Sequence, residues 1–445
     1  MPARARAALR AIVHRLPVAH AYAERRRLRL VSESQARAIS HFEARNEELV
    51  EEAGQLAAKV DALTAEVREL RTLDKPLHVF WPVRKEDVVA ADWHRPSRLP
   101  QRPRHEPPHT LNWVMTPVGQ ASGGHVDVFR TIAYLEQRGH RSRVYFYDPL
   151  HTVGFDEIKA TMQSYPAIDA ELQYNALAME PCDAVFATSW PTAYPVLNLG
   201  GNAKKFYYVQ DYEPYFEPVG TYSVLAADTY RFGLHGLTLG DWLAEKLSSE
   251  YGMTCEPFGF GVDSSSYELR NRQPRQRVLF YAKPTSHRRG FELGTLALEQ
   301  FHERHPDYEI DLLGADVDRY ELSFPCNRHG VLSVEALCDL YNRCAAGLVL
   351  SFTNMSLLPL EMLACGCIPV SNDAPHTRRA QYAEQLRYAE ATPLALADAL
   401  YAAARDGEYA ATVERAAEYA RQFDWEASNR RIEQVLLREL GGAAG

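Results

Sequence analysis

The stretch SLLPLEMLACGCIPVSN, residues 356–372, contains the signals of a helix, a turn and a strand in immediate succession. Pro359 suits the first turn of a helix, where its missing N–H is not needed, and Gly366 suits the end of one. The apolar residues 367–370 then predict a short buried strand. A helix that leads directly into a buried strand is a building unit of a parallel α/β sheet.

Glu361 is the one charged residue in this otherwise apolar stretch. An acidic side chain in the first turn of a helix complements the helix dipole, which gives Glu361 a purely structural explanation. A bound ligand that requires a carboxylate gives it a functional one. Both explanations stay open until the rest of the chain is considered.

Similar strand and helix signals recur along the chain. Strands are predicted at residues 111–116, 142–147, 183–189 and 205–210, and again at 277–282, 308–313, 347–351 and 368–371. Alternation of strands with helices predicts an α/β fold with two Rossmann-like domains, each a doubly wound parallel sheet. In such sheets ligands bind beyond the carboxyl ends of the strands, so we expect the site in the cleft between the domains.

The chain divides into six predicted segments. They are a basic N-terminal segment, 1–30; a coiled-coil helix, 31–74; a Pro-rich linker or surface strap, 75–109; an N-terminal Rossmann-like domain, 110–265; a C-terminal Rossmann-like domain, 266–425; and a C-terminal helix, 426–445. A chain of 445 residues is too long for one hydrophobic core, which agrees with two domains.

Composition and charge exclude several classes of protein. No apolar run is long enough for a membrane span or a signal peptide, and seven scattered cysteines without a C-x-x-C pair predict reduced thiols in the cytoplasm. Residues 1–30 carry a charge of +7, so the remainder carries −16, which argues against nucleic-acid binding by the main body. The basic segment predicts peripheral contact with anionic lipid at the inner face of the membrane, unless it is a solvated tail.

Leucines spaced by seven residues mark the predicted coiled coil. They are Leu49, Leu56, Leu63 and Leu70. Asn46 at an interior position favours a parallel two-stranded register, so we expect a homodimer through residues 39–71. The alternative is a single amphipathic helix that lies on the protein's own body.

Three strand ends carry groups suited to a nucleotide sugar. Gly123 and Gly124 lie between a strand and a helix, where backbone N–H groups can bind an anion, although a plain turn has the same pattern. The segment FYAKPTSHRRGFELG, residues 280–294, gathers Lys283, Arg288 and Arg289, cations suited to a leaving diphosphate or simply to an exposed loop.

The third strand end is YYVQDYEPYFEP, residues 207–218, in which Asp211 and Glu213 stand among aromatic residues. Aromatic faces stack on sugar rings, and a carboxylate at a strand end can orient or deprotonate a hydroxyl. The alternative is that the two acids cap the following loop.

The order of these blocks resembles glycosyltransferase family 4 of the GT-B fold. FYYVQDYEPYFEP, FYAKP…RRGFELG and PLEMLACGCIPVSN are most similar to its bacterial rhamnosyltransferases of surface polysaccharides, and the resemblance covers residues 110–430. It implies a donor domain at 266–425 and an acceptor domain at 110–265. It also implies that Glu361 binds the ribose hydroxyls of the donor, which favours the functional explanation of this residue.

The resemblance implies further roles, residue by residue. The donor-binding residues would be Gly123, Gly124, Lys283, Arg288, Arg289, Gly330, Val331, Ser356, Leu357 and Glu361, with Gly330 and Val331 facing the nucleobase. The acceptor-binding residues would be His125, Asp211, Tyr212 and Glu213, and the catalytic group Asp211, Lys283 and Arg289. Lys283 departs from the family, which more often has Arg there.

A second departure concerns the family's paired glutamates. The position of the first is held by Thr353, so a mechanism that depends on that glutamate is in doubt, and a scaffold that binds nucleotide sugars without transferring them stays an alternative. We expect a retaining hexosyltransferase that uses dTDP-L-rhamnose and a glycan or lipid-linked glycan acceptor. UDP- or GDP-linked sugars are the alternative donors. We expect no metal and no other cofactor, because no D-x-D pair is expected to face the cleft.

Deleting residues 1–74 should leave a folded protein that glycosylates a small synthetic acceptor but works poorly on a membrane-borne one. The cut removes no predicted strand, so the two domains should still fold. It does remove the basic N-terminal segment, and two such segments joined by a coiled coil would bind an anionic bilayer more strongly than one. Liposome co-sedimentation and light scattering, at low and high salt, compare the full and shortened chains. A full-length protein that is monomeric and ignores anionic liposomes would contradict this.

Overall fold

The computed structural model describes residues 82–94, 107–119, 122–174, 176, 178–405 and 407–441, with isolated helical positions between residues 21 and 59. It divides the chain into two compact units, Met1–Phe80 and Trp81–Gly445. The predicted basic segment, coiled coil and dimer contact lie outside the described residues, apart from those isolated positions. Within the described part of the chain, none of the helices combines the length and apolar character needed to cross a bilayer.

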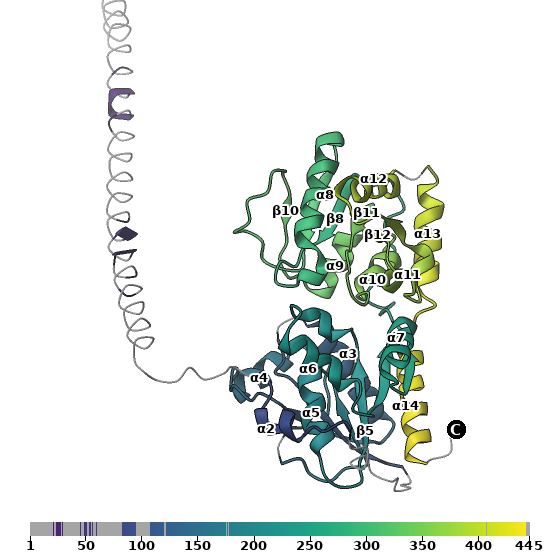
Figure 1. Cartoon of the computed structure of the whole chain (residues 1–445). Helices are drawn as coiled ribbons and strands as arrows, with labels where there is room; N and C mark the ends of the chain where they lie inside the picture. Colours follow the sequence, from purple (N-terminus) through teal and green to yellow (C-terminus); the bar gives the residue numbers. More distant parts are fainter. Residues whose placement is uncertain are drawn as a thin grey trace, which may run out of the picture. The chain divides into compact units, whose positions relative to one another are not determined.

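The first domain of the second unit is built on a parallel sheet (Figure 1). Its seven described strands are ordered β3-β2-β1-β4-β5-β6-β7. They are β1 (Thr110–Met115), β2 (Arg141–Phe146), β3 (Glu171–Gln173), β4 (Ala184–Ala187), β5 (Lys204–Val209), β6 (His235–Leu239) and β7 (Cys255–Phe258). The central strand β4, of sequence AVFA, is apolar and buried throughout, as expected of a strand that is covered on both faces.

Helices alternate with these strands. They are α2 (Lys85–Ala90), α3 (Gly123–Gln137), α4 (Phe155–Met162), α5 (Trp190–Asn198), α6 (Thr221–Thr229) and α7 (Asp241–Tyr251), with the short 3₁₀ helix η2 (Glu213–Phe216) after β5. The segment 82–94, predicted as a linker or a strap, packs on this domain: Val83 is fully buried and the Tyr147 hydroxyl donates to Asp87 at 2.8 Å.

The second domain repeats the architecture with a six-stranded sheet of described residues, ordered β10-β9-β8-β11-β12-β13. Its strands are β8 (Arg277–Tyr281), β9 (Glu309–Leu313), β10 (Asn327–Arg328), β11 (Ala346–Leu348), β12 (Ile368–Asn372) and β13 (Arg387–Ala389). Its helices are α8 (Phe291–Arg304), α9 (Val334–Tyr341), α10 (Leu358–Ala364), α11 (Pro375–Arg378), α12 (Pro393–Ala404) and α13 (Tyr409–Ala420), with 3₁₀ helices η3 (His287–Arg289) and η4 (Ala383–Gln385).

The stretch around Glu361 has the predicted form. Helix α10 begins at Leu358 with Pro359 in its first turn, and Gly366 ends it in the left-handed conformation, at a φ of 72°. Strand β12 follows at once and is fully buried. The helix, turn and strand predicted from residues 356–372 are therefore confirmed.

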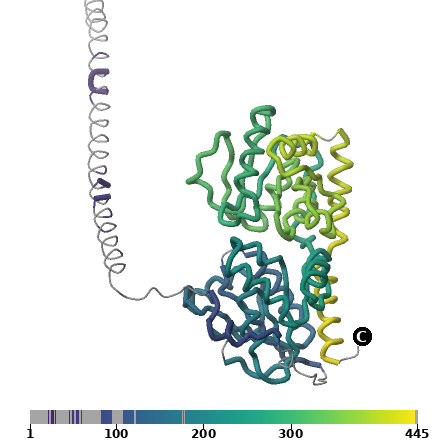
Figure 2. Tube along the Cα trace, viewed as in Figure 1, coloured from purple at the N-terminus to yellow at the C-terminus, as the bar shows by residue number. Residues whose placement is uncertain are grey.

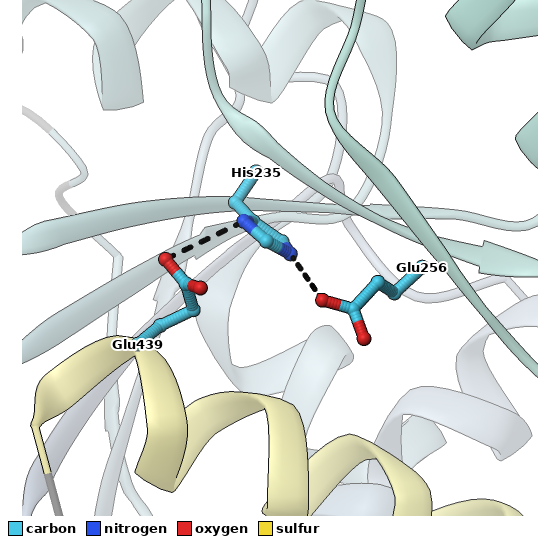
Figure 3. Close-up of side chains that lie close together, drawn as sticks. All are labelled: His235, Glu256 and Glu439. Carbon is cyan, nitrogen blue, oxygen red and sulfur yellow. Dashed lines mark ion pairs between the residues drawn. The ribbon is translucent and has the colours of Figure 1, made fainter.

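The last helix, α14 (Trp425–Leu440), returns to the first domain, where it packs on α3 and β7. Figure 2 shows this yellow segment beside the blue-green first domain after the chain has left the second. Ion pairs hold its end: His235 of β6 lies between the carboxylates of Glu256 and Glu439, at 3.5 and 3.6 Å (Figure 3). Lys204 also pairs with Glu439, and Arg438 with Glu256.

Candidate functional site

A cavity of about 430 Å³ lies between the two domains, at the carboxyl ends of strands from both sheets. The first domain lines it with residues that include Thr116, Ser122–His125, Asp127, Val128, Thr188, Ser189, Gln210, Asp211, Glu213, Phe216 and Leu239. The second domain contributes Tyr281, Lys283, Ser286, Arg288, Arg289, Met355–Leu358 and Glu361. The cavity therefore lies where ligands are expected in facing α/β domains.

Most of the predicted site residues meet in this cavity. Its lining includes Gly123, Gly124, His125, Asp211, Glu213, Lys283, Arg288, Arg289, Ser356, Leu357 and Glu361. Three predicted residues are not part of the lining: Tyr212, Gly330 and Val331. Tyr212 is buried in a cluster of tyrosines behind the wall, and Val331 is exposed on the loop after β10.

Asp211, directly after β5 and Gln210, binds the second domain through a buried carboxylate. Its Oδ2 accepts a hydrogen bond from Thr353 Oγ1 at 3.0 Å, and its Oδ1 accepts one from Asn354 N at 2.8 Å. Arg288 Nη1 lies 2.9 Å from Oδ2. A carboxylate with these partners links the domains and is poorly placed to act as a free general base. Thr353 stands where the resemblance places a glutamate, so the first domain supplies the carboxylate at that point.

Arg289 is buried and fixed by neutral and charged partners. Its Nη1 donates to Ser351 Oγ at 2.8 Å and to the carbonyl of Asn354 at 3.2 Å, and its Nη2 lies 3.8 Å from Asp211 Oδ2. Burial, together with the positive charge of Arg288, lowers the pKa of Arg289 to about 10. The guanidinium remains charged at neutral pH and is held at a fixed place in the wall.

Lys283 follows β8 and is a cation of a different kind. It lines the cavity, is only partly buried, and makes no ion pair with any of the described residues. Its neighbours Arg288 and Arg289, in contrast, share Asp211 as a counter-ion. Lys283 is therefore the cation of this group best placed to bind an incoming anion.

Glu361 is buried on α10 and faces the cavity. Burial raises its pKa to about 7, although the positive charge of Arg130 and the hydroxyl of Tyr341 oppose this rise. The Tyr341 hydroxyl donates to Oε2 at 3.4 Å. The hydroxyl of Tyr267 also acts on this carboxyl and lowers its pKa, and a carboxylate with two tyrosine hydroxyls nearby still has capacity for further donors, such as ligand hydroxyls.

The glycine turn and its neighbours shape the opposite wall. Gly124 lies close to Gln210, whose Nε2 donates to its carbonyl at 3.0 Å, and an added Cβ at Gly124 would lie 3.2 Å from that nitrogen. Gly123 has no such neighbour. Burial lowers the pKa of His125 to about 4, so this residue is neutral at pH 7, with Nδ1 2.8 Å from Ser122 Oγ.

Two buried acids complete the first-domain wall. Burial raises the pKa of Glu213 to about 8, against hydrogen bonds from Trp190 N at 2.6 Å and from the Tyr207 hydroxyl at 3.0 Å. Asp127 on α3 is equally buried and was not predicted as a site residue. The signal that could have indicated it is its position in the first turns of the helix that follows the glycine turn.

Among the described residues, the group suited by geometry to hold a metal ion is His235, Glu256 and Glu439. It lies at the start of β6 and the end of α14, away from the cavity lining. Because Lys204 and Arg438 already pair with the two carboxylates, the group is better described as an ion-pair network. The sequence also contains a D-x-D triplet, Asp316–Asp318, whose acids are exposed after β9 and do not line the cavity.

Comparison with known proteins finds one family model and one curated relative. The model of the WsaF C-terminal domain matches residues 276–401. The O-antigen biosynthesis protein RfbC of Myxococcus xanthus is 34% identical over 343 residues, which cover 74% of this chain. The chain spans only 27% of the length of that relative.

Solved structures share the fold at low sequence identity. Sucrose-phosphate synthase from Thermosynechococcus elongatus matches with a TM-score of 0.57 and 12% identity, over 75% of this chain and 99% of its own. Anabaena Alr3699/HepE in complex with UDP and glucose matches with a TM-score of 0.54 and 13% identity, over 73% of this chain and 98% of its own. These likenesses and the two facing parallel sheets establish the predicted GT-B fold.

Replacing Asp211 with Ala should lower the free energy of unfolding by about 3–5 kcal/mol, the range for removing one partner of a buried ion pair. The two arginines and the Asn354 amide would lose their shared acceptor. Denaturant titration measures the change. The matched control is Asp241→Ala, an exposed acid in the first turn of α7. An Asp211→Ala protein as stable as this control would contradict the linking role.

Proposed function

We propose that this chain is a glycosyltransferase, which moves a sugar from a nucleoside diphosphate donor to a glycan acceptor during synthesis of a surface polysaccharide. The observation that carries the proposal is the cavity itself, where the unpaired Lys283 and the buried Glu361 line one wall. The similarity to RfbC, an O-antigen biosynthesis protein, supports the process, and the fold shared with Alr3699/HepE, which has been solved in complex with UDP-glucose, supports the donor class.

The cations would act on the leaving group. When the bond between sugar and diphosphate breaks, negative charge grows on the diphosphate oxygens, and positive groups already fixed in place stabilise that charge. Arg289 is fixed by Ser351 and Asn354, and Lys283 is free to approach the diphosphate. These residues would stabilise the charge of the leaving diphosphate, as a metal ion does in other enzymes of this reaction type.

Glu361 would bind the nucleoside. Its carboxylate can accept hydrogen bonds from ribose hydroxyls, while the Tyr341 hydroxyl and the helix α10 hold it in place. The binding of a nucleotide at this wall, with its sugar directed at the first domain, would place the reacting carbon near His125 and Glu213. We assign these two residues to the acceptor side.

Asp211 would act through its neighbours. The carboxylate orients Arg288 and, at 3.8 Å, Arg289, so its loss would displace both cations from the diphosphate. We therefore propose a positioning role for Asp211 in place of proton abstraction. Tyr212, Gly330 and Val331 would contribute at most through the shape of the walls, because they do not line the cavity.

The finer proposal is transfer of L-rhamnose from dTDP-L-rhamnose, with retention of configuration and without a metal. It rests on the resemblance of the VQDYEP and LEMLACGCIPV blocks to bacterial rhamnosyltransferases. A panel of dTDP-, UDP- and GDP-linked sugars, followed by calorimetry and by turnover of labelled donor, decides among donors. Donor that binds without turnover would favour a sugar-binding scaffold.

Lys283→Ala should reduce turnover by about 10²–10³-fold, the cost of removing one group that stabilises the charge developing on the leaving diphosphate. Steady-state rates with labelled donor measure the effect. Lys159→Ala, on α4 outside the cavity lining, is the control and should leave the rate unchanged. A loss below about tenfold for Lys283→Ala would mean that another group stabilises the leaving diphosphate.

Glu361→Gln should weaken nucleoside diphosphate binding by about 1.5–3 kcal/mol, the range for a hydrogen bond to a charged group. In the unaltered protein affinity should rise between pH 6 and pH 8, because Glu361 ionises with a pKa of about 7 and only the carboxylate is a full acceptor. The Gln variant should lose this rise. If both proteins bound the nucleoside diphosphate with equal affinity at pH 8, Glu361 would only complement the dipole of helix α10 and would not bind the ligand.

A further inference from the structure

Several buried polar atoms of the described residues have no hydrogen-bond partner, and some of them face the cavity. Apart from Arg288 Nη1, which forms an ion pair with Asp211, these are Asp127 Oδ1 and Ser189 Oγ on the first domain, and Ser356 Oγ on the second. Buried polar groups are nearly always hydrogen-bonded in folded proteins. Their concentration along one cavity indicates positions at which a ligand supplies the missing partners. Ser356 is already among the predicted donor contacts, whereas Asp127 and Ser189 are not.

Asp127 is the most unusual of the three because it carries a carboxyl group. The residue is 3% exposed, and the nearest cation, Arg130 Nη1, lies 3.6 Å from Oδ1, too far for a hydrogen bond. Burial raises the pKa of Asp127 to about 8, with Arg130 opposing the rise and Glu361 adding to it. Burying a carboxyl oxygen that accepts no hydrogen bond is costly even with Arg130 at 3.6 Å, so a purely structural explanation of this residue is weak.

The charged and titratable groups around Asp127 come from several elements. Arg130 lies on the same helix and also stacks over the ring of Trp425 at 5.1 Å. Glu361 of α10 lies on the opposite wall, and the Tyr208 hydroxyl of β5 contacts Thr131 Oγ1 at 3.2 Å. His125, two residues earlier on α3, is neutral at pH 7. None of these groups donates a hydrogen bond to Oδ1.

The same surroundings limit the ligand chemistry. Two carboxyl groups, Asp127 and Glu361, line one cavity from opposite domains, so a phosphate group between them would be repelled. Hydroxyl groups suit both, because each can donate to a carboxylate or accept from a protonated carboxyl. The cations at 283 and 289 are available for the phosphates.

We propose that Asp127 is a second donor-binding carboxyl, contributed by the first domain, which hydrogen-bonds a ribose hydroxyl of the nucleotide across the cleft from Glu361. The inference rests on the proposed function in one respect, that the cavity takes a nucleoside diphosphate. It adds that the nucleoside is bound by both domains, so that occupation of the cleft joins α3 to α10. The group of the ligand that Asp127 and Glu361 would recognise is therefore the sugar hydroxyl and not the base.

The test compares Asp127→Ala with the unaltered full chain by calorimetry. The probes are UDP, whose ribose carries the 2′- and 3′-hydroxyls, and dTDP, whose deoxyribose carries the 3′-hydroxyl alone, each paired with its analogue that lacks the sugar hydroxyls. At pH 9, where Asp127 is ionised, affinity for UDP should fall about tenfold or more, the equivalent of one hydrogen bond to a charged group, and a fall with dTDP as well assigns the 3′-hydroxyl. The two proteins should bind the dideoxy analogues equally. The control is Glu136→Ala, the other acid of α3, which lies outside the cavity lining and should bind as the unaltered chain does.

Thermal melting separates binding from folding. Because Asp127 Oδ1 has no partner, Asp127→Ala and Asp127→Asn should melt at or above the temperature of the unaltered chain, most clearly above pH 8, where the buried carboxylate is ionised. Lower melting temperatures, or variants that fail to fold, would show that the carboxyl group supports the fold and would overturn the proposal. Unchanged affinity for dTDP and UDP would overturn it too, as would an equal loss with the dideoxy analogues.

The outcomes also separate this inference from the proposed function. Calorimetry measures binding and requires no sugar transfer. If nucleotide binding depends on Asp127 but the protein shows no turnover, the inference is supported and the proposed function is contradicted. An unaltered chain that binds neither dTDP nor UDP would overturn both.

Discussion

The buried carboxylate of Asp211 is the interaction on which the arrangement of the cleft depends. Asp211 lies just beyond the carboxyl end of β5, and its carboxylate accepts hydrogen bonds from Thr353 and Asn354 of the second domain. One of the two carboxylate oxygens, Oδ2, is also the counter-charge for Arg288 and Arg289. Without this carboxylate two guanidinium groups would share one wall without a counter-charge between them. Among the described residues, the loop before α10 would keep only the hydrogen bonds from Asn354 Nδ2 to the carbonyls of Gln210 and Leu239. One residue thus links domain geometry to the placement of positive charge.

Desolvation explains much of the remaining chemistry of the cavity. Burial is the largest cause of the raised pKa values of Asp127, Glu213 and Glu361, which reach about 7 to 8. Such groups lower the stability of the empty protein at alkaline pH, because the folded form must lose a proton that it binds more tightly than the unfolded chain. Perturbed acids gathered in one cleft are typical of functional sites, and here they stand next to free and fixed cations.

The sequence predicted the fold where local patterns are strong. The two sheets, the helix and strand around Glu361, and the meeting of Lys283, Arg289 and Glu361 in one cavity all followed from strand ends in a parallel sheet. Short or irregular strands were not predicted: β3, β7, β10 and β13 are two to four residues long, and β6 contains polar residues. The link between Asp211 and Thr353 and the isolation of Asp127 depend on contacts across 142 residues and on burial, which local periodicity does not encode.

The central claim, that this cleft holds a nucleoside diphosphate between its two walls, is tested most directly by a crystal structure of the protein with dTDP or UDP. The account predicts the diphosphate within hydrogen-bond distance of Lys283 Nζ and a ribose hydroxyl bonded to the Glu361 carboxylate. A nucleotide bound elsewhere on the chain, or one in the cleft with its phosphates away from Lys283 and Arg289, would contradict it.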